Sequence, residues 1–192
     1  MPLSWNEIRS NAIAFSKEFA TDSRENAEAK TFWDEFFKVF GLKRRTIASF
    51  EEPVKNLKGQ YGFIDLFWKA VLLAEHKSAG KDLHKAASQA FDYVQSLARD
   101  GREDEIPRYI ILSDFRRFVL FDLEKDTKHE FALGEFYKNV DKLAFIPGYK
   151  QHDLTVEDPI NIKAVQIMGD LHDELEAGGY EGPDLELSLI HI

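Results

Sequence analysis

The sequence predicts one α/β domain, in which a mixed β-sheet is flanked by helices, with helical extensions at both ends. Three observations support this fold class. The chain has 192 residues, enough for one domain with a substantial core. Apolar residues make up 44% of the chain and aromatic residues 13%, as in globular proteins. Helix-like and strand-like segments also alternate along the sequence, which is typical of layered α/β folds.

Two amphipathic helices are expected first, over residues 4–20 and 23–41. Each carries apolar residues at the spacing of one helical face. Ser4 followed by Glu7 is the pattern of a capping box at a helix start. Gly41 occupies a position at which helices commonly end.

Residues 42–60 are polar and interrupted by Pro53 and Gly59, so we expect a loop or irregular edge structure there. The apolar segment over residues 61–77 predicts two strands. The remaining patterns predict a helix over residues 83–99, strands over 108–114 and 117–124, a helix over 133–146 and a last amphipathic helix over 160–179. We therefore place one domain at residues 1–150 and a separate helical segment at residues 151–192.

The composition excludes several classes of protein. No apolar run approaches the roughly 18 residues of a membrane span, and the start of the chain has no signal-peptide pattern. The absence of cysteine rules out disulfides and thiolate metal sites and favours a cytoplasmic protein. A net charge of −9 argues against a free-standing nonspecific nucleic-acid binder. That charge is compatible with a domain that cuts DNA delivered by another part of a larger protein.

The most apolar segment, "YGFIDLFWKAVLLAEHK" at residues 61–77, contains charged residues that a buried strand should avoid. These residues are Asp65, Glu75 and Lys77. Side chains alternate across a strand, so Glu75 and Lys77 point to one face and His76 points to the other.

Whether Asp65 joins Glu75 depends on the turn between the two strands. By alternation, Asp65 shares its face with Phe63 and Phe67. It lies on the face of Glu75 only if odd-numbered residues of one strand oppose odd-numbered residues of the other. A three-residue turn at Trp68–Ala70 gives that register, a two-residue turn does not, and a bulge would restore it.

Two converging carboxylates in an apolar setting do not both stay ionised without a cation. Mg²⁺ resolves this because it prefers oxygen ligands and keeps positions for water and phosphate oxygens. We expect Asp65 and Glu75 to bind Mg²⁺ or Mn²⁺, with the backbone carbonyl of His76 as a further ligand. Lys77 would lie beside the attacking water during phosphodiester hydrolysis. The alternative is an edge hairpin whose charges face solvent, with Glu75 and Lys77 as a surface ion pair.

The motif "EHK" at residues 75–77, ten residues after Asp65, resembles the PD-(D/E)xK nuclease superfamily. Ile64 stands where that superfamily often has proline. Downstream, "QAFDY" places Gln89 and Tyr93 four residues apart on one helix, which resembles the Q-xxx-Y motif of RecB-like members. The resemblance implies a restriction-endonuclease-like core, with Gln89 and Tyr93 supporting the DNA or the metal-site residues. The alternative for this pair is a polar helix face.

A narrower resemblance covers nearly the whole chain. Similarity to the N-terminal region of MmeI-like Type IIL/IIG restriction–modification enzymes runs in order through residues 24–42, 61–97, 107–124 and 161–182. In that family one polypeptide carries a nuclease domain, a helical connector, an adenine-specific methyltransferase and a target-recognition domain. The resemblance implies that residues 151–192 begin the connector and that the S-adenosylmethionine-binding part lies outside this chain. Glu28 is where such nucleases often carry an additional acid, with Glu25 and Glu35 as competitors.

These observations give one expected function and one rival. The expected function is Mg²⁺-dependent cleavage of double-stranded DNA, with Asp65 and Glu75 as metal ligands and Lys77 assisting the attacking water. Two copies would meet transiently to cut both strands. The rival is a catalytically silent nuclease-like domain through which a DNA methyltransferase docks or interacts. The basic cluster Lys43–Arg45 either meets a DNA backbone or is a solvated loop, and the scattered histidines do not predict zinc.

Overall fold

The computed structural model describes residues 3–21, 25–55 and 60–148, without the side chains of residues 25–28. The backbone divides into two compact units between Tyr149 and Lys150, and the first unit is the one described. The helix expected over residues 160–179 and the connector expected over 151–192 lie outside the described residues. Within those residues, no helix is long and apolar enough to cross a membrane.

The described part folds into three α-helices, four short 3₁₀ helices and one six-stranded sheet. In chain order the elements are α1 (Trp5–Glu18), α2 (Glu25–Val39), η1 (Arg44–Thr46), β1 (Ser49–Lys55), β2 (Tyr61–Trp68), β3 (Leu72–His76), α3 (Leu83–Arg99), η2 (Glu103–Glu105), β4 (Tyr109–Ser113), β5 (Arg117–Asp122), β6 (Thr127–Ala132), η3 (Leu133–Lys138) and η4 (Val140–Leu143). The strands are ordered β1 to β6 across the sheet. Every neighbouring pair is antiparallel except β3 and β4, which are parallel and joined through α3. The predicted mixed sheet is therefore confirmed.

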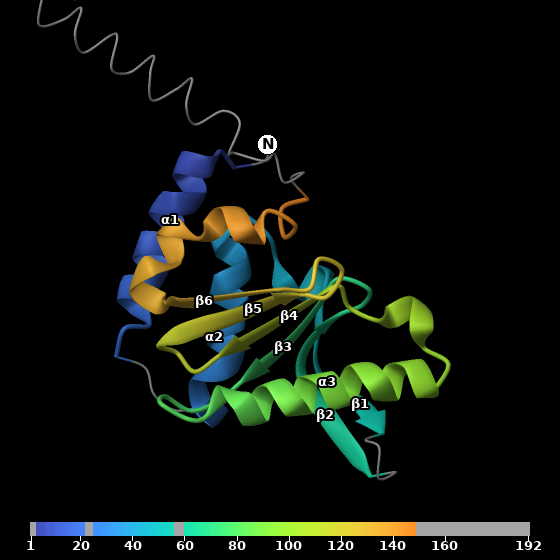
Figure 1. Cartoon of the computed structure of the whole chain (residues 1–192). Helices are drawn as coiled ribbons and strands as arrows, with labels where there is room; N and C mark the ends of the chain where they lie inside the picture. Colours follow the sequence, from blue (N-terminus) through green and yellow to red (C-terminus); the bar gives the residue numbers. More distant parts are fainter. Residues whose placement is uncertain (1–2, 22–24, 56–59, 149–192) are drawn as a thin grey trace, which may run out of the picture. The chain divides into compact units, whose positions relative to one another are not determined.

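Helices cover both faces of the sheet (Figure 1). On one face, α1 and α2 pack with η3 and η4, and Phe15 and Phe36 meet strand residues such as Ile111. On the other face, α3 packs through Leu97 and its neighbours on strand residues such as Leu73. We call these the α2 face and the α3 face.

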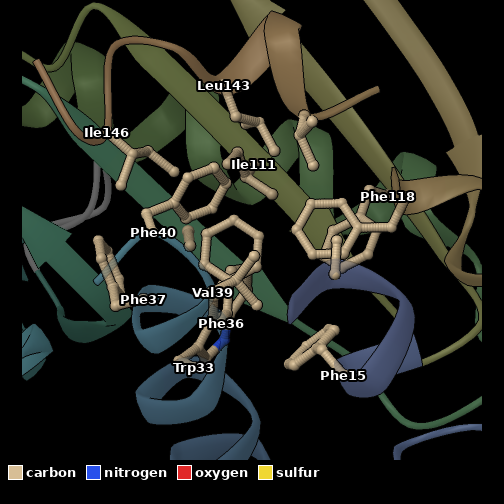
Figure 2. Packing of buried hydrophobic residues seen from close by; sticks show 14 of the residues in the cluster. Phe15, Trp33, Phe36, Phe37, Val39, Phe40, Ile111, Phe118, Leu143 and Ile146 are labelled. Atoms are coloured by element: carbon tan, nitrogen blue, oxygen red, sulfur yellow. The ribbon is translucent and has the colours of Figure 1, made fainter. Parts of the chain in front are cut away.

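The core of the α2 face is mostly aromatic (Figure 2). The ring centroid of Phe36 lies 5.2 Å from that of Trp33 and 5.8 Å from that of Phe118. Phe15 and Phe136 add an edge-to-face pair at 5.5 Å. Such pairs contribute about 0.5–1.5 kcal/mol each beyond the burial of their area. This layer forms a rigid support beneath the centre of the sheet.

Local signals in the sequence mark the helix ends. The Ser4 hydroxyl accepts the Glu7 N–H at 3.3 Å, and the Glu7 carboxylate accepts the Ser4 N–H at 2.8 Å, so the predicted capping box is confirmed. Asp82 caps α3 by accepting the His84 N–H at 2.8 Å. Gly41 has φ 75°, the left-handed conformation expected just after a helix.

Three elements differ from the prediction. β1 is a strand within residues 42–60, and it tolerates Pro53 because it lies at the edge of the sheet. β6 is not among the predicted strands, because Phe131 is its one buried residue and the segment therefore lacks an alternating apolar pattern. Residues 133–146 form η3 and η4 instead of one α-helix, and Asn139 between them has a φ of −114°, outside the helical range.

Candidate active site where β2 and β3 separate

A three-residue turn joins β2 to β3. Trp68 pairs with Leu72, which leaves Lys69–Val71 as the turn, and the Val71 N–H closes it on the Trp68 carbonyl at 3.0 Å. The predicted turn, at residues 68–70, is one position too early, because Ala70 takes the turn's left-handed conformation with φ 60°. Both registers oppose residues of equal parity, so the predicted parity is confirmed even though the turn has moved.

The two strands part immediately after the last ladder pair, Leu66 with Ala74. We call this point the fork. There the Asp65 carboxylate accepts the backbone N–H of His76 at 2.8 Å. The backbone N–H of Asp65 in turn lies 3.4 Å from Glu75 Oε1. Bonds between side chains and backbone thus replace the ladder and bring the two carboxylates together.

The strands also change face at Asp65. Ile64 belongs to the α3-face core while Leu66 belongs to the α2-face core, although residues two apart normally share a face. Phe67 packs in the α3-face core, so it does not share a face with the exposed Phe63 as simple alternation predicts. Glu51, which falls opposite Asp65 on β1, has φ 54°, a conformation that distorts a regular strand.

Glu75 is fully buried at the fork. Burial, and after it the nearby charge of Asp65, raise its pKa to about 8. Lys77 opposes this shift, since its ammonium lies 3.3 Å from Glu75 Oε2. At neutral pH the Glu75 carboxyl of the bare protein is therefore mostly protonated.

Lys77 follows the last residue of β3. Its backbone N–H donates to the Ser113 carbonyl at 2.8 Å, which extends the contact between β3 and β4. Its side chain is 23% exposed, so the ammonium lies between the buried Glu75 and the solvent. Glu75 and Lys77 are brought together as predicted, but the acid is buried and does not form a surface ion pair.

His76 points its ring to the α2 face, as predicted. The imidazole centroid lies 4.2 Å from that of Phe115 and 4.9 Å from that of Phe32. Burial, and then the charge of Lys77, lower its pKa to about 3, so the ring is neutral. Neither ring nitrogen has a hydrogen-bond partner in the described part. The imidazole is therefore no ligand for a cation at the fork, and the backbone of His76 is what faces Asp65.

Gln89 and Tyr93 support the fork from α3. The Gln89 side chain donates to the Tyr93 hydroxyl at 2.9 Å, and that hydroxyl donates to the Phe63 carbonyl at 3.1 Å. Burial is the main cause that raises the Tyr93 pKa, and the charges of Glu75 and Asp65 add to it. The pair thus holds β2 two residues before Asp65.

Gly62 is a site residue that belongs to none of the predicted motifs. A Cβ at this position would lie 2.7 Å from the Tyr93 hydroxyl oxygen, far inside contact distance. Only glycine lets β2 approach α3 this closely. A glycine inside a predicted strand is the signal that could have identified it.

The other residues that the sequence singles out are not part of the cluster at the fork, or their side chains lie outside the described residues. Glu25 and Glu28 lie in α2, but their side chains are outside the description, so the role of Glu28 stays a prediction. Glu35 pairs with Lys38. Lys43–Arg45 line a cavity of about 330 Å³ beside α2. In the described residues, no group of three or more His, Asp or Glu side chains is arranged to hold a metal ion.

Comparisons with known proteins give a matching family and several similar solved chains. The family described as MmeI, N-terminal domain, matches residues 10–178. The fold is similar to a chain in the cryoEM structure of a DrdV–DNA complex, with 17% sequence identity and a TM-score of 0.45. That similarity covers 91% of this chain and 16% of that chain, so this chain spans about one sixth of its length. The sequence matches none of the curated proteins.

Proposed function

Because the chain belongs to the family of MmeI N-terminal domains, we propose that it is a Mg²⁺-dependent DNA endonuclease domain with a PD-(D/E)xK core. The observation that carries this proposal is the meeting of Asp65, Glu75 and Lys77 at the fork. In a longer protein, target recognition and S-adenosylmethionine-dependent methylation would belong to other domains. A transient pair of copies would then cut both strands of a duplex.

The donor set at the fork suits a hard divalent cation. Burial beside Asp65 makes the ionised form of Glu75 unfavourable, and a cation between the two carboxylates would remove that penalty. The N–H and C=O of one strand residue point to the same side, so the His76 carbonyl lies on the side of Asp65. Asp65, Glu75 and the His76 carbonyl would therefore hold Mg²⁺ or Mn²⁺, which accept such oxygen ligands.

When bound, the cation would lower the pKa of a water molecule and neutralise negative charge on the phosphate. The protein's own groups provide the rest of the chemistry. The Lys77 ammonium, released from Glu75, can donate hydrogen bonds to the attacking water and to a phosphate oxygen. The His76 N–H holds the Asp65 carboxylate in place beside Glu75.

Metal binding tests this proposal without relying on cleavage. We expect the chain to bind Mn²⁺ in a calorimetric titration, and Glu75→Gln to weaken binding by more than about tenfold. Glu35→Gln is the matched control, because Glu35 is also a lysine-paired glutamate but lies away from the fork. Equal Mn²⁺ affinity in the wild type and Glu75→Gln would contradict the proposal.

The rival proposal is a silent nuclease-like domain through which a methyltransferase docks on DNA. The contact between the Lys77 ammonium and Glu75 favours it, because the buried acid has a polar partner at the fork without any metal. The rival predicts no Mn²⁺ binding at the fork. It also predicts that Lys77→Met leaves DNA binding unchanged and that no divalent cation supports cleavage.

A further inference from the structure

Beyond the fork, β1 and β2 continue as a two-stranded arm formed by residues 53–55 and 61–63. In Figure 1, the ends of these strands project past α3. Tyr61 is 69% exposed and Phe63 is 54% exposed. They are two of the four large hydrophobic residues exposed in the described part, and they lie two residues apart on one strand. They therefore share one face of the arm.

The opposite face of the arm packs against α3. Val54 and Ile64 are buried in the α3-face core, and Gly62 packs directly against Tyr93. Arg99 and Arg102, in the α3 region, donate to the carbonyls of Lys55 and Pro53. A supported apolar face that remains exposed is an interaction surface more often than an accident of sequence.

We propose that the exposed face of this arm contacts a groove of double-stranded DNA beside the phosphodiester held at the fork. The inference rests on the proposed function. Tyr61 lies four residues before Asp65, or about 13 Å along the strand, which matches about four base-pair steps. A duplex that lies along β2 from Asp65 would therefore pass the arm.

The chemistry of the face matches this partner. A two-stranded ribbon fits the major groove, and apolar side chains such as phenylalanine wedge between base steps in the minor groove. Lys55 lies opposite Tyr61 on β1, with its ammonium 5.6 Å from the ring centroid. The face thus offers two rings for bases and one cation for a phosphate.

The test uses the whole chain, a short fluorescent duplex and anisotropy measured over a range of salt concentrations without divalent metal. The double variant Tyr61→Thr/Phe63→Thr keeps strand-forming residues and should weaken binding by at least about tenfold, with the salt dependence unchanged. Lys55→Gln should reduce the slope of log K against log salt by about 0.9, the loss of one phosphate contact. Phe91→Thr is the matched control, because Phe91 is an exposed aromatic residue on α3.

Several results would overturn the proposal. One is wild-type affinity in the double variant, and another is an equal loss in Phe91→Thr. A third is the absence of DNA binding by the wild type. A fourth is that the wild type is a dimer and the double variant is the only variant that is a monomer, which would make the arm a contact between two copies. Mn²⁺ binding by the same variants separates this inference from the proposed function. If the variants bind Mn²⁺ and the double variant keeps wild-type DNA affinity, only the proposed role of the arm is rejected. If the double variant loses DNA affinity but the protein binds no Mn²⁺, only the nuclease proposal is rejected.

Discussion

The Asp65 carboxylate accepts the backbone N–H of His76 at 2.8 Å, where a continuous ladder would place a backbone carbonyl. The acid therefore completes the hydrogen bonding of β3 and also lies beside Glu75. These two roles separate in variants, because an amide can accept the same hydrogen bond but binds a divalent cation poorly.

Asp65→Asn should keep the fold and lose the metal. The amide oxygen can still accept the His76 N–H, so the free energy of unfolding should stay close to that of the wild type. Asp65→Ala leaves that N–H without its partner and should cost about 1–3 kcal/mol. Urea unfolding measures both variants, and a Mn²⁺ titration should show weakened binding in each. Wild-type metal affinity in Asp65→Asn would remove Asp65 from the ligand set.

Lys77→Met should separate metal binding from chemistry. Methionine keeps most of the apolar stem but supplies no charge for the attacking water, so cleavage in Mg²⁺ should fall by about 100-fold or more. Mn²⁺ affinity should change far less, measured at a pH where Glu75 is ionised. The comparison requires a DNA-cleaving preparation, and undiminished cleavage by Lys77→Met would rule out the assigned role.

The stability of the bare protein should be greatest in mildly acidic solution. Glu75 has its pKa raised from 4.5 to about 8, so the folded state holds its proton longer and the unfolding free energy falls as pH rises through that window. His76 has its pKa lowered from 6.5 to about 3, so its contribution is lost as pH falls from 6.5 to 3. The two trends oppose each other between pH 4.5 and 6.5.

Glu75→Gln tests the alkaline side of this profile. Above pH 6.5, Glu75 alone of the two residues still changes protonation, with a slope of up to about 1.4 kcal/mol per pH unit. Urea unfolding of Glu75→Gln from pH 6.5 to 8 should show a much flatter curve than the wild type. Saturating Mg²⁺ should flatten the wild-type curve in the same way, because a bound cation favours the ionised carboxylate. Identical slopes in the wild type and the variant would show that Glu75 titrates normally.

The sequence predicts the fork only in part. Strand alternation is a local property, so the sequence predicts the parity of Asp65 and Glu75 for each possible turn length, and the structure selects the three-residue turn. The change of face at Asp65 does not follow, because simple alternation excludes it, and neither does the left-handed conformation of Glu51 in a polar, proline-containing segment. The close approach of Gly62 to Tyr93 likewise depends on how α3 crosses the sheet.

Gly62→Ala should show how strongly that approach fixes the fork. The added methyl would lie 2.7 Å from the Tyr93 hydroxyl oxygen and 2.9 Å from Cε1, so β2 or α3 must shift, at a cost of about 1–3 kcal/mol. Tyr93→Phe alone should cost about 1 kcal/mol through the lost bond to the Phe63 carbonyl. In Gly62→Ala/Tyr93→Phe the added methyl no longer meets the hydroxyl oxygen, although it still meets the ring edge. The loss of unfolding free energy in this double variant should therefore be smaller than the sum of the losses in the two single variants. Gly134→Ala is the control, since nothing lies within 4 Å of its added methyl. Strict additivity in urea unfolding would show that Gly62 and Tyr93 act independently, and the support of Asp65 from α3 would then need another explanation.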